Sequence, residues 1–187
     1  MRSTFGSFFL LALSPAAALA AEWRVDPARS TIAAVVNQGG GTFEARFGRF
    51  AAEVAFDPAR PEATRVAITV DTASFASGHA QRDQVATGDA FLASGSHRDA
   101  RYVTRAVRPL GGDRYEVEAE LELRGVARPL THTAVIAAGP EEARATGEVE
   151  MARADWGVGP GGQPGPEVGP VVTVRFDLAA TRREQGG

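Results

Sequence analysis

Residues 113–123 read Asp-Arg-Tyr-Glu-Val-Glu-Ala-Glu-Leu-Glu-Leu, and this stretch decides the fold class. Glutamates occupy the even positions from 116 to 122. A period of two is that of a β-strand with one face toward water and the other toward an apolar interior. Neighbouring glutamates on one strand repel each other, so we expect their face to be exposed. The opposite face carries Tyr115, Val117, Ala119, Leu121 and Leu123.

The same alternation recurs along much of the chain. Val66, Ile68 and Val70 share a face within 65–75, and a second set of apolar residues alternates within 171–181. The pattern predicts about eight strands and no internal repeat. So many one-sided strands need a shared interior, which a closed antiparallel barrel supplies. An interior wider than its side chains can fill would be a lipophilic pocket.

Two segments depart from the strand pattern. Residues 78–93 lack a period of two and predict a short helical insertion, with a helix near 79–85 and a turn near 89–93. Gly48 lies inside the alternating segment 42–57 and predicts a bulge or a sharp bend of the barrel. We therefore predict an all-β fold, a closed antiparallel barrel interrupted by one helical insertion.

Composition excludes several classes of function. The net charge of −3 argues against nucleic acid as a partner. The chain has no cysteine, which excludes disulfides, thiolate catalysis and cysteine-ligated metals. Its 187 residues suffice for one domain with a sizeable core. No linker divides it, and we expect a single domain over 21–181 followed by a disordered tail at 182–187.

The first twenty residues have the pattern of a secretory signal peptide. Arg2 gives a weakly positive start, 5–13 form an apolar core, and Ala18-Leu19-Ala20 places small residues before a cleavage site. We expect cleavage after Ala20 and a soluble, exported protein, with the periplasm as its compartment. The alternative is an uncleaved anchor helix, although the apolar stretch is short for a membrane span.

The three histidines share no metal-binding spacing. His79 and Asp83 are four residues apart on the predicted helix, where a hydrogen bond at the surface is favoured over a metal site. His132 is in phase with Leu130, Ala134 and Ile136. If that face is internal, His132 is either a hydrogen-bonded core residue or a contact for the head group of a ligand.

No catalytic set is evident. The chain lacks a Gly-x-Ser-x-Gly motif, and Ser-x-x-Lys is impossible without lysine. Ser77 precedes the predicted helix and is interpreted as its cap. Arg82 with Asp83, and Arg153 with Asp155, are interpreted as structural ion pairs, one of which could close an end of the barrel. The sequence thus predicts neither a catalytic residue nor a metal ligand.

Several ordered segments resemble the YceI-like proteins. Residues 23–30 resemble their opening Trp-x-x-Asp-x-x-x-Ser. Residues 123–130, Leu-Arg-Gly-Val-Ala-Arg-Pro-Leu, are similar to an Arg-Gly-Val-x-x-Pro signature of the family, and 153–159 to its penultimate motif. The segments Phe-Gly-Arg-Phe at 47–50 and Val-Asp-Thr-Ala-Ser-Phe at 70–75 complete the order. The resemblance spans about the whole mature chain.

The resemblance implies an eight-stranded antiparallel lipocalin-like barrel with a short helical insertion around residues 78–93. It implies export, often dimers, and an apolar tunnel that holds a long polyisoprenoid chain, with no catalytic residues. Members of the family commonly have an apolar residue where His132 stands, so His132 is expected to make the tunnel locally polar.

We therefore predict a non-enzymatic, exported binding protein that sequesters or carries a long-chain isoprenoid lipid, either a polyprenyl compound or an isoprenoid quinone. No cofactor or metal is expected, while transient membrane contact and a homodimer are. The predicted tunnel-lining residues are Val35, Phe50, Val54, Phe56, Ile68, Val70, Phe91, Leu92, Tyr102, Val117, Leu121, His132, Ile136, Val174 and Phe176.

Three alternatives stay open. The first is an accessory electron-transfer or stress-response protein with a quinone or haem group in the barrel, in which His132 or His97 acts directly. The second is a lipid esterase, disfavoured by the missing nucleophile motif. The third is a barrel filled by its own side chains, which would make the protein an interaction module.

Overall fold

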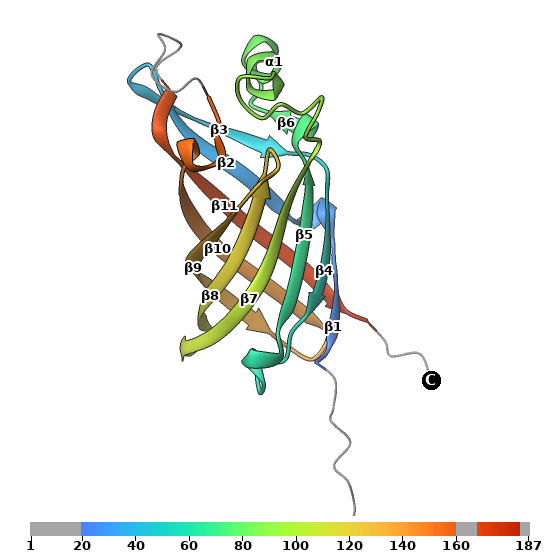
Figure 1. The fold of residues 1–187 in the computed structure, drawn as a ribbon. Helices are drawn as coiled ribbons and strands as arrows, with labels where there is room; N and C mark the ends of the chain where they lie inside the picture. Colours follow the sequence, from blue (N-terminus) through green and yellow to red (C-terminus); the bar gives the residue numbers. More distant parts are fainter. Residues whose placement is uncertain (1–19, 160–167, 184–187) are drawn as a thin grey trace, which may run out of the picture.

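The computed structural model describes residues 20–159 and 168–183 and places their strands in one antiparallel sheet. One α-helix, α1 (Ala80–Thr87), stands over one end of the sheet, and the two described chain ends lie at the other (Figure 1). The strands are β1 (Glu22–Val25), β2 (Thr31–Gln38), β3 (Gly41–Phe47), β4 (Phe50–Ala55), β5 (Arg65–Asp71), β6 (Phe75–Ala76), β7 (Asp99–Gly111), β8 (Arg114–Leu123), β9 (Val126–Ala138), β10 (Glu142–Ala152) and β11 (Val168–Arg182).

Eight strands close into a ring in the order β1-β4-β5-β7-β8-β9-β10-β11, because the end of β11 pairs with β1. Trp23 lies opposite Arg182 at this closing seam. The earlier part of β11 pairs with β2 instead, and β3 and β6 continue the sheet from there. The prediction of an eight-stranded antiparallel barrel with one short helix is confirmed.

The stretch that decided the fold class forms β8, with the predicted faces. Tyr115, Val117 and Ala119 are buried, and two of the glutamates, Glu116 and Glu122, stand opposite arginines of β7. Arg105 contacts Glu120 at 2.8 Å, and Arg108 contacts both Glu116 and Glu118. Such exposed pairs add little stability, so the burial of the apolar face is what fixes β8 in the barrel.

The end of the barrel opposite α1 is closed by a packed core. Trp23 is 2% exposed, and its indole Nε1 donates to the carbonyl oxygen of Phe56 at 3.0 Å. The Phe56 and Tyr115 rings pack edge to face, with centroids 5.5 Å apart. Other members of this closed-end core are Val107, Val117, Ala119, Ala134 and Ala180.

The elements begin and end close to the predicted residues, with small differences. The predicted strand 42–57 is split at Gly48, whose N–H donates to the Ser74 carbonyl at 3.1 Å. The predicted helix 79–85 begins one residue later and continues to Thr87. Ser77 does not cap it, because the Ser77 hydroxyl is hydrogen-bonded to the Asp83 carboxylate. The segment predicted as a turn near 89–93 is a turn.

The chain ends differ in part from the expectation. β11 continues to Arg182, the first residue of the predicted disordered tail, and the Arg183 N–H donates to the Glu22 carbonyl at 2.9 Å. The rest of that tail lies outside the described residues, as do the predicted signal sequence up to residue 19 and most of the Gly/Pro-rich loop.

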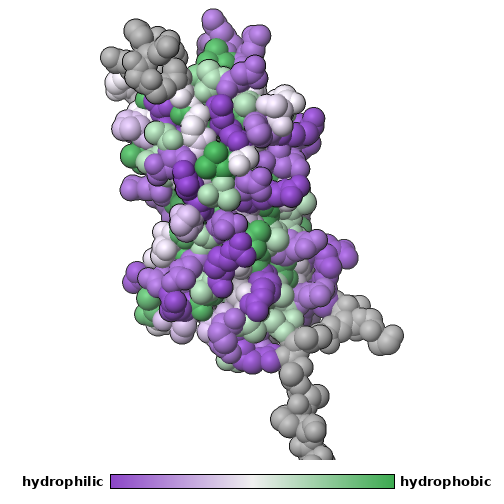
Figure 2. All heavy atoms as spheres, in the orientation of Figure 1, coloured by the Kyte–Doolittle hydropathy of each residue, from purple (hydrophilic) through white to green (hydrophobic). Residues whose placement is uncertain are grey.

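The outer surface is mixed. Figure 2 shows hydrophilic side chains over most of the visible face, with small hydrophobic areas between them. The large exposed apolar residues come from separate elements: Val85, Val103, Leu110, Val135 and Val171. Within 20–159 and 168–183, no helix is both long and apolar enough to cross a membrane.

Candidate functional site

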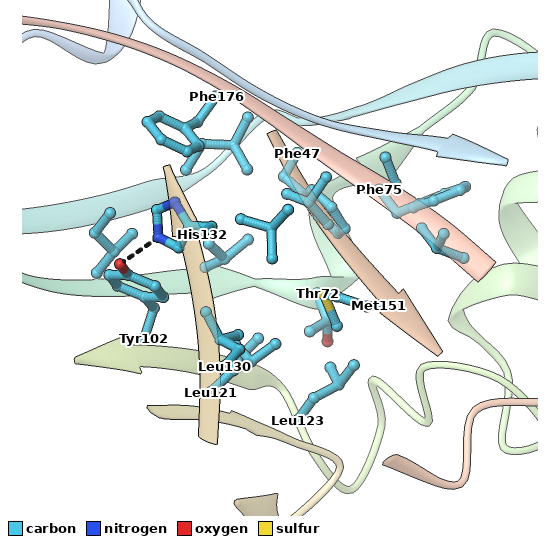
Figure 3. A pocket seen from close by; sticks show the side chains of 18 of the residues that line it. Phe47, Thr72, Phe75, Tyr102, Leu121, Leu123, Leu130, His132, Met151 and Phe176 are labelled. Carbon is cyan, nitrogen blue, oxygen red and sulfur yellow. Dashed lines mark hydrogen bonds between the residues drawn. The ribbon is translucent and has the colours of Figure 1, made fainter. Parts of the chain in front are cut away.

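A cavity of about 300 Å³ occupies the barrel between the closed-end core and α1. Its wall is almost entirely apolar, and inward-facing side chains of the strands supply most of it. Figure 3 shows the labelled side chains around this space, with Tyr102 and His132 at one side and Phe47, Phe75 and Met151 at the other. The interior is therefore wider than its own side chains can fill.

Most of the residues predicted to line the tunnel lie on this wall. His132 lines the cavity together with Leu130, Ala134 and Ile136, the residues that share its face of β9. Contact of each residue with a ligand stays a prediction. The predicted residues on the wall are Ile68, Val70, Phe91, Leu92, Tyr102, Val117, Leu121, His132, Ile136, Val174 and Phe176.

Four predicted residues are not on the wall. Val35 is on the opposite face of β2, because Ala34 and Val36 face the cavity and neighbours alternate. Phe56 belongs to the closed-end core, and Val54 packs against it. Phe50 pairs with Val70 and is half-buried, but does not line the cavity.

The sequence prediction missed other wall residues for which a signal existed. Phe43 and Phe47 alternate along β3, and Val149 and Met151 alternate along β10. In both segments the period of two was visible, but neither was assigned to the interior. Other missed wall residues include Ile32, Ala34, Val36, Phe75, Leu123 and Leu130.

The cavity reaches the surface beside α1. Val85 lines it and is nevertheless 47% exposed, and the helix has no buried residue. The Arg82 guanidinium lies 4.0 Å from the centre of the Phe43 ring, which joins α1 to β3. The helix therefore adds little buried apolar area at this end of the cavity.

The two predicted Arg–Asp ion pairs do not form. Arg153 donates to the carbonyl oxygens of Val158, Gly169 and Val168 at 2.6, 2.9 and 3.1 Å, while Asp155 is exposed. Arg153 thus fastens the start of β11 beside η4 (Arg153–Trp156). This prediction was wrong because the backbone of a distant segment offers acceptors that sequence proximity does not reveal.

The second pair is also replaced by other hydrogen bonds. Arg82 Nε donates to the Ser77 hydroxyl at 2.8 Å. The Ser77 hydroxyl and N–H both donate to the Asp83 carboxylate, which lowers the pKa of Asp83. The network ties the first turn of α1 to the end of β6.

Tyr102 and His132 both line the cavity and are hydrogen-bonded to each other. Among the strands that the structure describes, they are the one such pair of side chains. Tyr102 Oη lies 2.8 Å from His132 Nε2, reaching from β7 across β8 to β9. The Phe176 ring packs edge-on against the imidazole, with centroids 5.7 Å apart. Burial raises the pKa of Tyr102 and lowers the pKa of His132, so both groups are neutral at neutral pH.

We expect His132 to make stability pH-dependent. Its pKa in the folded chain lies below the usual 6.5, so the unfolded chain takes up a proton first as the pH falls through that value. The free energy of unfolding should therefore decrease below pH 6.5, by at most about 1.4 kcal/mol per pH unit. Urea unfolding on both sides of this pH measures the slope, which His132→Leu should reduce. A surface His97→Gln variant that removed the slope equally would contradict the assignment.

Thr64 places an unpaired hydroxyl on the wall. Within the part of the chain that the structure describes, its Oγ1 is the one buried side-chain polar atom with no hydrogen-bond partner. An unsatisfied buried hydroxyl is destabilising. We therefore expect Thr64→Val to raise the free energy of unfolding by about 1 kcal/mol.

The matched control for this prediction is Thr72→Val. Thr72 also lines the cavity, but its hydroxyl is hydrogen-bonded to Ser94 Oγ at 2.9 Å and to the Arg98 carbonyl at 2.8 Å. Loss of the Thr72 hydroxyl should lower the free energy of unfolding by about 1–3 kcal/mol. Denaturant titration measures the change in the free energy of unfolding for both variants, and we expect the two changes to have opposite signs. Destabilisation by both would show that the Thr64 hydroxyl has a hydrogen-bond partner in solution.

The remaining histidines do not face the cavity. His79 precedes α1 and His97 is exposed. Over 20–159 and 168–183, no three His, Asp or Glu side chains are grouped so as to hold a metal ion.

Residues 23–180 match the model of the YceI-like domain family. The chain is 32% identical over 154 residues to a UPF0312 protein of Shewanella oneidensis, covering 78% of this chain and 81% of the relative. It is 30% identical over 139 residues to a UPF0312 protein of Pseudomonas putida, covering 72% of each.

Several solved structures share the fold. BcnA of Burkholderia cenocepacia superposes with a TM-score of 0.80 at 30% identity, covering 84% of this chain and 99% of BcnA. A domain of Saccharophagus degradans, described as a polyisoprenoid binding domain implicated in plant cell wall breakdown, gives 0.65 at 15% identity. That likeness covers 89% of this chain and 100% of the domain.

Proposed function

We propose that this chain, which belongs to the YceI-like family, binds a long-chain isoprenoid lipid in its barrel cavity and sequesters or carries it. The observation that carries the proposal is the apolar cavity between the closed-end core and α1. Each methylene removed from water contributes about 0.8 kcal/mol, so a long branched tail binds tightly without polar contacts. The fold shared with the polyisoprenoid binding domain of Saccharophagus degradans supports the ligand class by analogy.

The charges around the cavity favour a neutral tail inside. The polar groups that line the cavity away from α1 are uncharged, and the arginines on the wall, Arg82 and Arg153, lie at the α1 end. An ionised head group would lose its hydration in the middle of the barrel without a partner. The proposed role is binding rather than catalysis.

A series of prenyl compounds of increasing length tests the proposal. Displacement of an apolar fluorescent dye should give affinities that rise with each isoprene unit until the cavity is filled and then level off. Straight alkyl chains of the same carbon number serve as the comparison for branching. Affinity that does not change with chain length would count against binding in the cavity.

A quinone is a second candidate for the bound group, favoured by the Tyr102–His132 pair. The pair fits haem poorly, because His132 Nε2 is hydrogen-bonded to Tyr102 and Nδ1 lies 3.4 Å from the Thr133 carbonyl. Neither ring nitrogen is directed at the cavity without a partner. His97, the other histidine considered for a direct role, does not line the cavity.

We further propose that the protein acts outside the cytoplasm, in the periplasm. The signal-peptide pattern of residues 1–20 supports this. The mass of the protein isolated from its own cells should correspond to a chain that begins at Ala21. A full-length mass in a soluble cytoplasmic fraction would contradict export. The homodimer and the transient membrane contact stay predictions.

A further inference from the structure

We infer that the Tyr102–His132 pair is a recognition site for the oxygen-bearing ring of a prenylated quinone or quinol, with the ring toward the closed end of the barrel and the tail toward α1. The inference rests on the proposed function and adds to it an orientation of the ligand and two specificity-determining residues.

The position of Tyr102 and His132 in the barrel indicates how the ligand is oriented. Tyr102 packs against the closed-end core, and His132 lies opposite Val117, a member of that core, across β8 and β9. The rest of the cavity extends from the pair past Met151 and Phe75 toward α1 (Figure 3). A ring held at the pair therefore leaves the longer part of the cavity, and its opening, to the tail.

The chemistry of the pair matches both redox forms of such a ring. When His132 carries its proton on Nε2, it donates to Tyr102 Oη, and the tyrosine O–H is free to donate to a quinone carbonyl. When the proton is on Nδ1, near the Thr133 carbonyl, Nε2 accepts from the tyrosine, whose oxygen can then accept from a quinol hydroxyl. One tautomer change of a neutral imidazole serves both ligands.

Two further observations point to a neutral ring. The Tyr102, His132 and Phe176 rings lie with successive centroids 5.9 and 5.7 Å apart, so the site has an aromatic frame. The unpaired Thr64 hydroxyl also lines the cavity, from the residue that precedes β5. An isoprenoid hydrocarbon offers no acceptor to the Thr64 or the Tyr102 hydroxyl, whereas a ring with oxygen substituents does.

The test compares two ligands with the same short prenyl tail, a benzoquinone and a benzene ring without oxygen, by equilibrium dialysis. Tyr102→Phe should weaken quinone binding about 5- to 10-fold, the value of one neutral hydrogen bond, and leave the prenylbenzene unchanged. Tyr115→Phe is the matched control, because the other tyrosine of the chain belongs to the closed-end core and does not line the cavity.

A spectroscopic readout separates recognition from a structural effect. Infrared spectra of a carbonyl-labelled quinone should show a lower C=O stretching frequency when it is bound to the unaltered protein, and this shift should be lost with Tyr102→Phe. His132→Leu should reduce quinone affinity in the same direction, with prenylbenzene binding retained or improved.

The outcomes distinguish isoprenoid binding in the cavity from recognition of the ring by Tyr102 and His132. Binding of neither ligand by the unaltered protein overturns the proposed function itself. Equal losses for both ligands on Tyr102→Phe, or an unshifted carbonyl band, overturn the ring site while leaving isoprenoid binding in place. A quinone-specific loss together with loss of the band shift supports the site.

Discussion

Trp23→Ala is expected to lower the free energy of unfolding by about 3–5 kcal/mol, a large part of the stability of a domain of this size. The side chain is 2% exposed at the centre of the closed-end core. Its removal leaves a cavity beside Phe56 and an unpaired Phe56 carbonyl. It also loosens the seam where β1 pairs with both β4 and β11. Guanidinium titration followed by far-ultraviolet circular dichroism measures the loss.

Two variants control this experiment. Trp23→Phe keeps most of the buried apolar area and should recover much of the lost stability, leaving the missing hydrogen bond as the difference. Leu110→Ala removes an apolar side chain that is 49% exposed, so its effect should stay within about 0.5 kcal/mol. A loss below about 1 kcal/mol for Trp23→Ala would mean that the end of the barrel is not closed by this core.

Ala100→Phe is expected to weaken the binding of a long prenyl ligand roughly 50-fold, if the new ring displaces about three methylene groups at about 0.8 kcal/mol each. Ala100 lines the cavity opposite Val70, and is half-buried because it borders empty space. The ring can therefore enter the cavity with little strain on the wall. Dye displacement with the longest ligand of the prenyl series measures the change.

The matched control is Ala127→Phe. Ala127 is exposed on β9 opposite Glu122, on the outer face of the barrel. The same substitution there should leave both ligand binding and the free energy of unfolding close to those of the unaltered chain. Equal affinity for the ligand in both variants would place the binding site outside the cavity.

The fold could be predicted because the strands are one-sided. In β8 the alternation of glutamate with apolar residues leaves a single choice of inner face, and Tyr115, Val117 and Ala119 are buried as expected. In β2 the run Ile-Ala-Ala-Val-Val is apolar on both faces, so its phase was ambiguous, and Val35 was assigned to the interior wrongly.

The polar features of the site depend on contacts that alternation does not encode. The internal position of His132 followed from the phase of β9, but its pairing with Tyr102 depends on a side chain reaching across β8. Likewise, Arg153 bonds to carbonyls around Val168 and Gly169 because β11 returns beside η4. Such contacts join residues far apart in sequence, and only the closed barrel brings them together.

Native mass spectrometry of the protein isolated from its own cells, followed by solvent extraction, tests the central claim most directly. We expect a mass above that of the mature chain, and an extract that contains a polyprenyl compound or a prenylated quinone. The Ala100→Phe variant, expressed and isolated in the same way, should carry much less of it. A bare mass that does not change on addition of long prenyl compounds would contradict isoprenoid binding in the cavity.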